Sequence, residues 1–444
     1  MERVIKIKKG LDIPLDGAAV GASVSDTQTS LYGIVPDDYP GYIWKARVKP
    51  GDKVKAGDKL MSDKETDSVW LVSPVDGEVA EIRRGARRHI EAIVVKREGG
   101  FVADKETTLT DAVSIRTALK ESGLWAMMRQ RPFDIVPAPD SEPRDIYVTA
   151  FDSAPLAGPV ITPRLSKWLE KGLEILKHLT SGNVYLAVRS DSRIRSNVAE
   201  ILTMEGPHPA GNVGVQIANT NPVNKGETVW TLDAATVCRI GLLASEGKCD
   251  YTVEVAVTGP AIRNPHFVEC GMGISMEGLL RPFEPITGNH LRYISGNVLT
   301  GKRVNLKEGF LRWPYRQVTV IEEGDTADEF MGWASMNPKK YSVKRSFPAF
   351  LRGLSSPFPF DARIKGGRRA MILSGEYDKV FPFDIYPEYL LKAIIAGDID
   401  RMEQLGIYEV APEDFALPEF VDTSKMELQK IVIEGLDSLR KELS

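Results

Sequence analysis

Residues 53–79 read KVKAGDKLMSDKETDSVWLVSPVDGEV and set the character of the amino-terminal part of the chain. Turn pairs such as Gly57-Asp58 and Asp76-Gly77 separate short runs of apolar and polar residues. This pattern is typical of short β-strands joined by tight turns. Similar runs, YIWKARV and EAIVVK, stand on either side, and MERVIKI at the start has the pattern of a first strand. We therefore predict a β domain over residues 1–100.

The same stretch resembles the core of a biotinyl or lipoyl carrier, a hammerhead also called a barrel-sandwich hybrid. In such carriers the residue after Glu-Thr-Asp is the lysine that bears the cofactor, and here that residue is Ser68. A serine hydroxyl does not form the stable amide that a carrier needs, and Lys64 lies four residues too early. We therefore expect a retained scaffold with no covalently bound cofactor.

Length and composition limit the function classes. A chain of 444 residues exceeds one ordinary core, so we expect several domains. The 57 basic residues nearly balance 61 acidic ones, which gives no electrostatic footprint for nucleic acid. Three cysteines are too few for an iron–sulfur cluster, which takes about four thiolates. No apolar window reaches the ~18 to 20 residues of a membrane helix. We therefore expect no transmembrane helix.

Beyond residue 100 the pattern changes to alternating strands and helices. We predict strands at DIYVTA and NVYLAV and helices at 111–123, 162–182, 196–204 and 233–247, the last capped by Asp233. Such alternation favours a Rossmann-like α/β domain over residues 101–250. The Pro-rich segment 131–145 within it has the composition of a connector on the surface.

The remainder of the chain divides in two. Alternating apolar runs return at Tyr251 and predict a β-grasp (SLBB-like) domain over residues 251–330. Residues 331–444 turn mainly helical, with Pro387 in the first turn of one helix and an apolar stripe along the last. The fold class that we predict is therefore multidomain α/β and β.

Sequence motifs for common active sites are missing or weak. The glycine-rich stretch GMGISMEG lacks the third glycine of a dinucleotide-binding loop. The stretch EGPHPAGNVG, residues 205–214, either brings backbone amides near a ligand or forms a tight structural turn, and we favour the turn. Five scattered histidines predict no metal site, and no G-x-S-x-G elbow occurs. We predict no catalytic residue.

A set of unusual motifs runs along the whole chain. In order they are IKKGLDIP, GARRHIEAIVVK, ESGLWAMMRQRPF, VTAFDSAPLA, EGPHPAG, YSVKRSF and GEYDKVFPFDIYPEYLLKAIIAGD. With these motifs the chain resembles NqrA, the A subunit of the Na+-translocating NADH:quinone oxidoreductase (Na+-NQR), the bacterial respiratory sodium pump. It departs from many relatives at FVDTSKMELQ, from Phe420, where a Cys-Pro-Gly-Lys-Tyr stretch is expected.

This family also resembles the flavin-binding subunit of respiratory complex I and the C subunit of a ferredoxin-oxidising pump. Those relatives carry a G-G-A-x-F-P flavin loop and cluster cysteines, whereas FDSAPLAGP stands at the comparable place here. The resemblance therefore implies an electron-transfer scaffold without FMN and without an iron–sulfur cluster.

The resemblance also implies the role of the chain. We expect a peripheral subunit on the cytoplasmic face of the bacterial inner membrane, bound to the other subunits of the complex, especially the membrane-embedded B subunit. The complex oxidises NADH on another subunit, reduces quinone and moves Na+ outward, so the chain acts as an enzyme only within the assembly. The quinone, ubiquinone or menaquinone, stays open. The alternative is a purely structural docking or assembly subunit.

Four residues near the connector are our candidates for a quinone site: Trp125, Arg131, Phe133 and Pro137. The aromatic rings offer stacking to a flat head group, and Arg131 offers a hydrogen bond to a carbonyl oxygen. We expect these side chains to gather on one exposed surface. An equally good interpretation is that they pack the connector against a partner.

Overall fold

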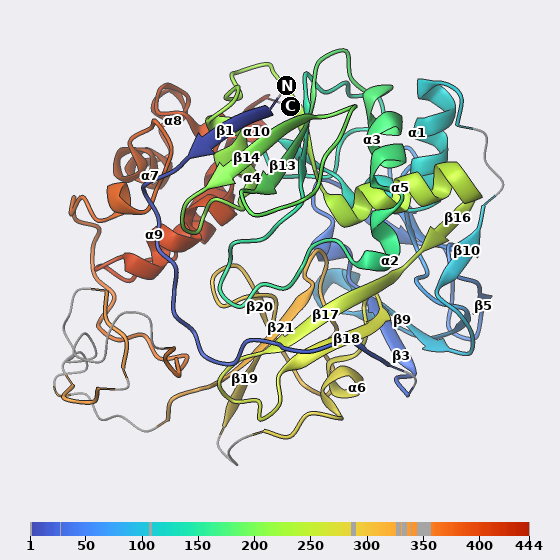
Figure 1. Ribbon diagram of the computed structural model, residues 1–444, viewed down its shortest axis with the longest axis horizontal. Coiled ribbons are helices and arrows are strands. Elements are labelled where there is room, and N and C mark those ends of the chain that lie inside the picture. The colour runs from blue at the N-terminus through green and yellow to red at the C-terminus, as the bar shows by residue number, and fades with distance from the viewer. Residues whose placement is uncertain are drawn as a thin grey trace.

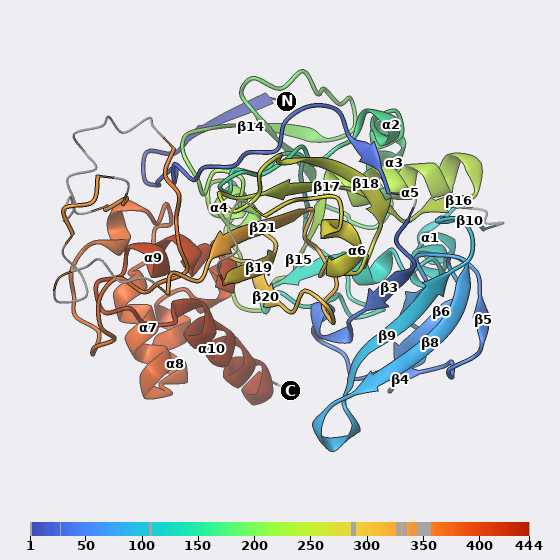
Figure 2. The same ribbon diagram turned by 90° about the horizontal axis from the view of Figure 1, so that it is seen from below.

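The computed structural model describes residues 2–26, 28–105, 109–285, 290–325, 330, 335–338, 340–343 and 357–443. Residues 344–347 of YSVKRSF and residues 331–334, at the start of the predicted helical domain, lie outside this set. Figure 1 shows a central sheet with helices α3 (Leu169–Lys177) and α5 (Ala234–Glu246) on one side and the carboxy-terminal helices on the other. In Figure 2 the amino-terminal β domain and the carboxy-terminal helices lie on opposite sides of a further sheet.

The amino-terminal domain consists of two small sheets, of order β3-β9-β8-β5 and β4-β6-β7. Leu60, Val69, Val75, Val79 and Ile93 are completely buried between them, as the alternating pattern requires. The strands are β3 (Leu31–Ile34), β4 (Trp44–Ala46), β5 (Lys53–Val54), β6 (Lys59–Asp63), β7 (Trp70–Val72), β8 (Gly77–Arg84) and β9 (Ile90–Arg97), with short helical turns η1 (Pro36–Asp38) and η2 (Ala86–Arg88).

Ser68 lies in the turn between β6 and β7. The buried carboxylate of Asp63 organises this turn, because it accepts hydrogen bonds from the amides of Thr66 (2.6 Å), Ser68 (2.8 Å) and Val69 (3.0 Å). The Ser68 hydroxyl lies 2.6 Å from that of Thr66. At the position where a carrier would present its lysine, this turn thus has the short side chain of Ser68, which is hydrogen-bonded to Thr66.

The central sheet has the order β1-β14-β13-β12-β15-β11. Its first five strands pair in parallel, and β11 runs antiparallel to β15 at one edge. The strands are β1 (Glu2–Lys6), β11 (Arg129–Arg131), β12 (Ile146–Thr149), β13 (Val184–Arg189), β14 (Glu200–Glu205) and β15 (Val229–Asp233).

Both faces of the central sheet are buried, as is usual for parallel strands. Along β12, Ile146 and Val148 join the core that includes α3 and α5, whereas Tyr147 points into a core shared with the carboxy-terminal helices. Helices α3 and α5 cross at two glycines, because a Cβ on Gly172 or Gly241 would lie 2.0 Å from a backbone oxygen across the contact. The helices here are α1 (Ala112–Glu121), η3 (Trp125–Met127), α2 (Pro163–Ser166), α3 (Leu169–Lys177), α4 (Val213–Ala218) and α5 (Ala234–Glu246).

A third sheet has the order β2-β18-β17-β21-β19-β20, and β10 pairs with β16 beside it. These strands are β2 (Val24–Ser25), β10 (Val102–Asp104), β16 (Lys248–Asp250), β17 (Thr252–Thr258), β18 (His266–Gly271), β19 (Leu291–Ser295), β20 (Lys302–Val304) and β21 (Gln317–Glu322), with helix α6 (Met276–Leu280).

The carboxy-terminal part is helical, as predicted. It contains η5 (Tyr377–Lys379), α7 (Pro387–Ala396), α8 (Ile399–Gln404), η6 (Ile407–Glu409), η7 (Pro412–Phe415), α9 (Ala416–Val421) and α10 (Leu428–Leu443). Helix α7 begins at Pro387 and ends at Gly397, which has a left-handed φ of 69°. No helix in the described ranges combines the length and apolar character that a bilayer crossing requires.

Several local predictions are confirmed. Helix α1 begins after Asp111, whose side chain accepts from the amides of Val113 and Ser114. Helix α5 begins after Asp233, whose Oδ1 accepts from the amide of Thr236 at 2.7 Å. The predicted helix 162–182 is present but interrupted at Trp168, between α2 and α3. Capping residues therefore located these helices well.

Other local predictions are wrong. The predicted helix 196–204 is largely strand β14, in which Ile201 and Leu202 point into the two different cores. A strand buried on both faces shows a continuous apolar run, which periodicity does not separate from a buried helix. Within the segment 1–100, two strands join sheets outside the barrel-sandwich part, because β1 pairs with β14 and β2 pairs with β18. Such long-range edge pairing leaves no local signal.

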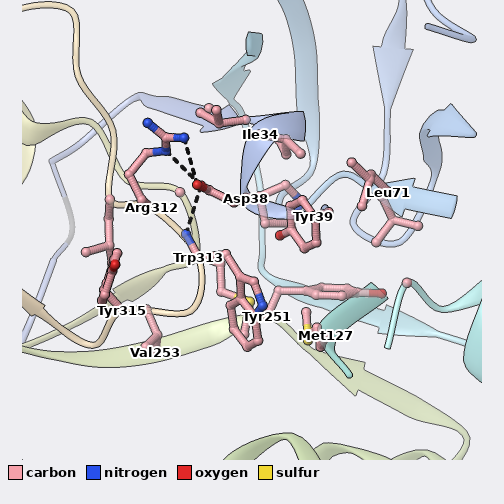
Figure 3. Close-up of a pocket in the computed structure, with 18 residues that line it drawn as sticks. Ile34, Asp38, Tyr39, Leu71, Met127, Tyr251, Val253, Arg312, Trp313 and Tyr315 are labelled. Carbon is pink, nitrogen blue, oxygen red and sulfur yellow. Dashed lines mark hydrogen bonds and ion pairs between the residues drawn. The ribbon is translucent and has the colours of Figure 1, made fainter. Parts of the chain in front are cut away.

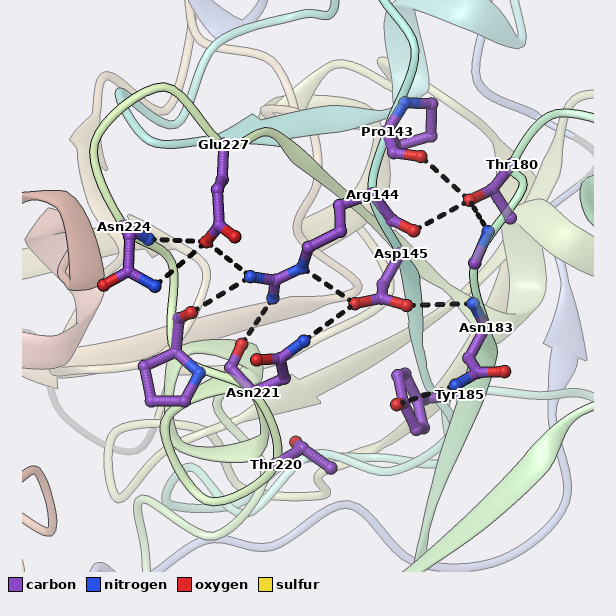
Figure 4. A network of polar contacts seen from close by, with 12 residues as sticks. Pro143, Arg144, Asp145, Thr180, Asn183, Tyr185, Thr220, Asn221, Asn224 and Glu227 are labelled. Carbon is purple, nitrogen blue, oxygen red and sulfur yellow. Dashed lines mark hydrogen bonds and ion pairs between the residues drawn. The ribbon is translucent and has the colours of Figure 1, made fainter.

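A polar network fixes the amino ends of the central strands (Figure 4). Arg144 donates to Asp145 Oδ2 at 2.9 Å, to Glu227 Oε2 at 2.5 Å and to the Asn221 carbonyl at 2.6 Å. The other oxygen of Asp145 accepts from the amide of Asn183 at 2.9 Å. One guanidinium therefore joins the segments that enter β12, β13 and β15.

Replacing Arg144 with Met should lower the free energy of unfolding by about 2–4 kcal/mol, because two carboxylates lose their cation and two carbonyls lose donors. The matched control is Arg189→Met, whose largely exposed side chain has one ion pair, to Asp191 at 3.6 Å. The control should change the free energy by less than about 0.5 kcal/mol. Urea unfolding measures both; equal effects would contradict the structural role of the network.

Candidate functional site

The carboxyl edge of the central sheet is open. From β12 the chain moves outward through β13 to β14 and then returns to the other side of β12 as β15. In open α/β sheets this reversal of strand order creates a crevice where ligands bind. A cleft of about 640 Å³ lies at this point, lined by Thr149, Phe151 and Asp152 after β12 and by Leu232 and Asp233 at the end of β15.

All four parts of the chain contribute to the walls of the cleft. The amino-terminal domain supplies Asp38 and Gly41, the third sheet Gln317, and helix α10 Leu436 and Arg440. Segments far apart in the sequence therefore form one site, and its shape depends on how the domains are joined.

Each of the five basic side chains that line the cleft has a protein partner. Their contacts are Arg316 with Asp233 (2.8 Å), Lys302 with Asp38 (3.0 Å), Arg129 with the Asp38 carbonyl (2.6 Å), Arg440 with the Gly41 carbonyl (3.0 Å) and Arg131 with Glu413 (2.7 Å). A nucleotide phosphate would have to compete with these contacts.

Arg131 lies at the centre of an acidic cluster in which Asp414 is fully buried and Asp134 and Glu413 are partly exposed. Its side chain is 2 % exposed and lies 2.7 Å from Glu413 Oε1, 3.3 Å from Asp414 Oδ2 and 3.5 Å from Asp134 Oδ1. The second oxygen of Asp414 is buried and has no hydrogen-bond partner among the residues that the structure describes. It packs against Gly214, where a Cβ would approach to 2.5 Å. Three carboxylates thus face one guanidinium, and the cluster carries excess negative charge.

This excess charge favours a bound proton. Burial raises the pKa of Glu413 to about 8, and the neighbouring Asp414, Asp134 and Asp152 add to the rise although Arg131 opposes it. Burial also raises the pKa of Asp414. Like charges in a poorly solvated site cannot all ionise together. The cluster therefore holds a proton at neutral pH.

Glu413 should make the stability of the protein depend on pH. Its pKa rises from 4.5 when unfolded to about 8 when folded, so folding takes up a proton between these values. The stabilisation is complete below pH 4.5 and is lost as the pH rises towards 8. Replacing Glu413 with Gln should flatten the fall in melting temperature between about pH 5 and 8.

The control for this experiment is Glu205→Gln, which removes a surface ion pair with Lys6. The control should keep the pH dependence of the parent protein. Differential scanning calorimetry at several pH values measures it, and a Glu413→Gln variant as pH-dependent as the parent would show that the proton resides elsewhere.

The structure separates the four residues predicted for a quinone site. Trp125 is 0 % exposed, its indole nitrogen donates to the Pro137 carbonyl at 2.9 Å, and its ring meets the edge of Trp230 at 5.1 Å. Pro137 is also buried, and only Arg131 and Phe133 line the cleft. The expectation of one exposed cluster is therefore wrong, because Trp125 and Pro137 are buried in the protein interior, where Trp125 packs against Trp230 of the central sheet.

A second, smaller cavity of about 50 Å³ lies beside the cleft (Figure 3). Its lining is mainly apolar and aromatic, with Tyr39, Leu71, Tyr251 and Val253 among its members. It shares four lining residues with the cleft, namely Asp38, Met127, Trp313 and Tyr315. The two cavities therefore adjoin. We call the cleft at the sheet edge the polar part and the smaller cavity between the domains the apolar part of the site.

Sequence reasoning missed the residues that shape the polar part. Asp38 gives no local signal, since its partners Lys302 and Arg312 lie 264 and 274 residues away. The unusual composition of the turn 205–214 is a usable signal, and the structure folds this turn onto the loop after β12. There Ser153 Oγ lies 3.0 Å from His208 Nδ1 and accepts from the Gly211 amide at 2.8 Å.

Known protein families agree with this architecture. One family model, described as NqrA N-terminal barrel-sandwich hybrid domain, matches residues 5–98. A second, NqrA second alpha/beta domain, matches residues 110–249, and a third, NQRA C-terminal domain, matches residues 254–305. The predicted barrel-sandwich domain is thereby confirmed, while the names Rossmann-like and β-grasp stay predictions. A solved NAD+-reducing [NiFe]-hydrogenase aligns at 12% identity with a TM-score of 0.38, over 75% of this chain and 62% of that chain, which is too distant to carry an inference.

Curated relatives match over the full length. The A subunit of the Na(+)-translocating NADH-quinone reductase of Vibrio atlanticus is 36% identical, and those of Pasteurella multocida and Neisseria meningitidis serogroup B are 35% and 34% identical. Each match covers 99% of this chain and 100% of the relative. The chain belongs to the NqrA family, the A subunits of Na+-translocating NADH-quinone reductases.

Proposed function

We propose that this chain is a peripheral subunit of a Na+-translocating NADH–quinone reductase, on the cytoplasmic face of a bacterial inner membrane. The observation that carries this proposal is the full-length identity of 34–36% to proteins named as the A subunit of that enzyme. The activity belongs to the complex, which couples NADH oxidation by quinone to outward Na+ transport. The partners of the chain are the other subunits, above all the membrane-embedded B subunit.

Within the complex, we assign this chain to the quinone-reducing end. The support is the chemistry of the cleft, whose cations are all engaged by the protein and whose apolar part is rich in aromatic rings. A quinone has a flat ring with two carbonyl oxygens and an apolar tail, and it carries no phosphate. Tyr315 offers a ring contact where the polar and apolar parts meet, and Phe133 offers one within the polar part.

The alternative is a subunit that only shapes the assembly. Its support is that Trp125, Pro137 and Arg131 all serve internal packing or ion pairing. Binding of a short-tail soluble quinone to the full chain, measured by calorimetry, separates the two proposals. Saturable binding supports the quinone role, and absence of binding at millimolar quinone supports the assembly role.

We further propose that the chain carries no redox cofactor and no covalent modification. Ser68 stands in place of the carrier lysine, and the three cysteines lie on separate elements, α5, β16 and β18. The purified chain should therefore be colourless, with the mass of the unmodified sequence. Absorption spectroscopy and intact mass spectrometry test this, and stoichiometric flavin, iron–sulfur absorbance or a lipoyl or biotinyl mass shift would contradict it.

Deleting this chain should separate the two half-reactions of the complex. Na+-coupled quinone reduction in membranes should be lost, whereas electron flow from NADH to an artificial acceptor should remain because another subunit oxidises NADH. Both rates are measured in membrane vesicles, with immunoblots to verify that the other subunits are still assembled. Loss of both activities in an otherwise assembled complex would refute the assignment to the quinone end.

A further inference from the structure

His208 occupies a special place in the cleft. It lines the 640 Å³ cavity yet is only 4 % exposed, so its ring is held within the wall. Its backbone amide donates to Asp12 Oδ1 at 2.9 Å, and its carbonyl accepts from the Leu11 amide at 2.8 Å. The segment that follows β1 therefore fixes the main chain of His208 at the carboxyl edge of the sheet.

Ser153 fixes the ring of His208. Its hydroxyl oxygen lies 3.0 Å from Nδ1 and also accepts from the Gly211 amide at 2.8 Å. Gly211 packs so closely on this loop that a Cβ would lie 2.6 Å from the Ser153 amide nitrogen. No contact with a described residue engages Nε2, the other ring nitrogen. One nitrogen is thus held by the protein, and the other remains for a ligand.

The ring is uncharged at neutral pH. Burial lowers the pKa of His208, although Asp152, Asp12 and a hydrogen bond to the backbone of Ser153 oppose the effect. A neutral imidazole carries one proton, on one nitrogen only. If the Ser153 hydroxyl donates to Nδ1, that proton lies on Nε2, and the ring is a hydrogen-bond donor towards the cleft.

Arg131, which we expected from the sequence to donate a hydrogen bond to a ligand carbonyl, is less suited to that role than His208. Its guanidinium faces Asp134, Glu413 and Asp414, and freeing it would leave three carboxylates without their cation. A ligand carbonyl gains little from a donor that must first be withdrawn from three acidic groups, of which Asp414 is fully buried. His208 Nε2 carries no such cost, because no described residue competes for it.

We propose that His208, with its ring positioned by Ser153, donates a hydrogen bond from Nε2 to a carbonyl oxygen of the quinone that the cleft binds. This inference rests on the proposed quinone function and names its carbonyl-binding residue. His208 contacts the ligand, and Ser153 acts only through His208.

The binding test uses the full chain and a short-tail soluble quinone. His208→Leu removes the donor and should weaken binding about five- to tenfold, the usual effect of one lost neutral hydrogen bond. His208→Gln keeps an amide donor and should stay within about threefold of the parent. The matched control, His178→Gln, changes the exposed histidine that caps α3 and should leave affinity unchanged.

A spectroscopic test is independent of whether His208→Leu folds well. In the parent protein labelled with ¹⁵N-histidine, long-range ¹H–¹⁵N spectra should show the His208 proton on Nε2, with a shift of that nitrogen on quinone addition. Ser153→Ala should mix the two tautomers and weaken quinone binding while the melting temperature stays within a few degrees. A proton found on Nδ1 in both the free and bound forms would overturn the proposal.

The outcomes distinguish this inference from the function on which it rests. If the parent chain does not bind quinone, the quinone function fails and the role of His208 fails with it. If the parent binds quinone but His208→Leu binds equally well and Nε2 does not shift, only the role of His208 is overturned.

Discussion

The buried carboxylate of Asp38 joins three parts of the molecule. Its side chain is 2 % exposed and accepts from Lys302 at 3.0 Å, from Arg312 at 2.8 Å and from the amide of Trp313 at 3.1 Å. The carbonyl of the same residue accepts from Arg129, which belongs to the central sheet. A buried charge is tolerated only when its partners are present, since loss of one partner typically costs several kcal/mol. The amino-terminal domain, the third sheet and the central sheet are therefore held in one arrangement.

Both cavities depend on this arrangement, because Asp38 lines the cleft and the aromatic cavity beside it. Neither cavity belongs to a single domain. The cleft opens at the switch point of the central sheet, but its far wall comes from the third sheet and α10. A change in the packing of any one part would therefore alter the shape of the cleft.

Charge has different roles at the amino edge of the central sheet and in the cleft. At the amino edge, Arg144 satisfies two carboxylates and joins strand entries, so its charge stabilises the fold. In the cleft, Arg131 faces three acidic side chains, and the cluster retains a proton on or near Glu413. The basic side chains of the cleft thus have partners within the protein, and for this reason we propose the imidazole of His208, instead of Arg131, as the hydrogen-bond donor.

The sequence by itself determined the local elements and the family. The caps Asp111 and Asp233, the Pro387 and Gly397 boundaries of α7, and the hammerhead pattern around Ser68 all act over a few residues, so they are legible in the chain. Only the tertiary structure decided that β1 joins the central sheet, that residues 196–204 are not a helix and that Trp125 is buried. It also decided that Arg131 forms ion pairs with carboxylates 282 and 283 residues away and that Ser153 contacts His208. These contacts depend on edge pairing and on charges that meet only after folding, and neither leaves a periodic trace in the sequence.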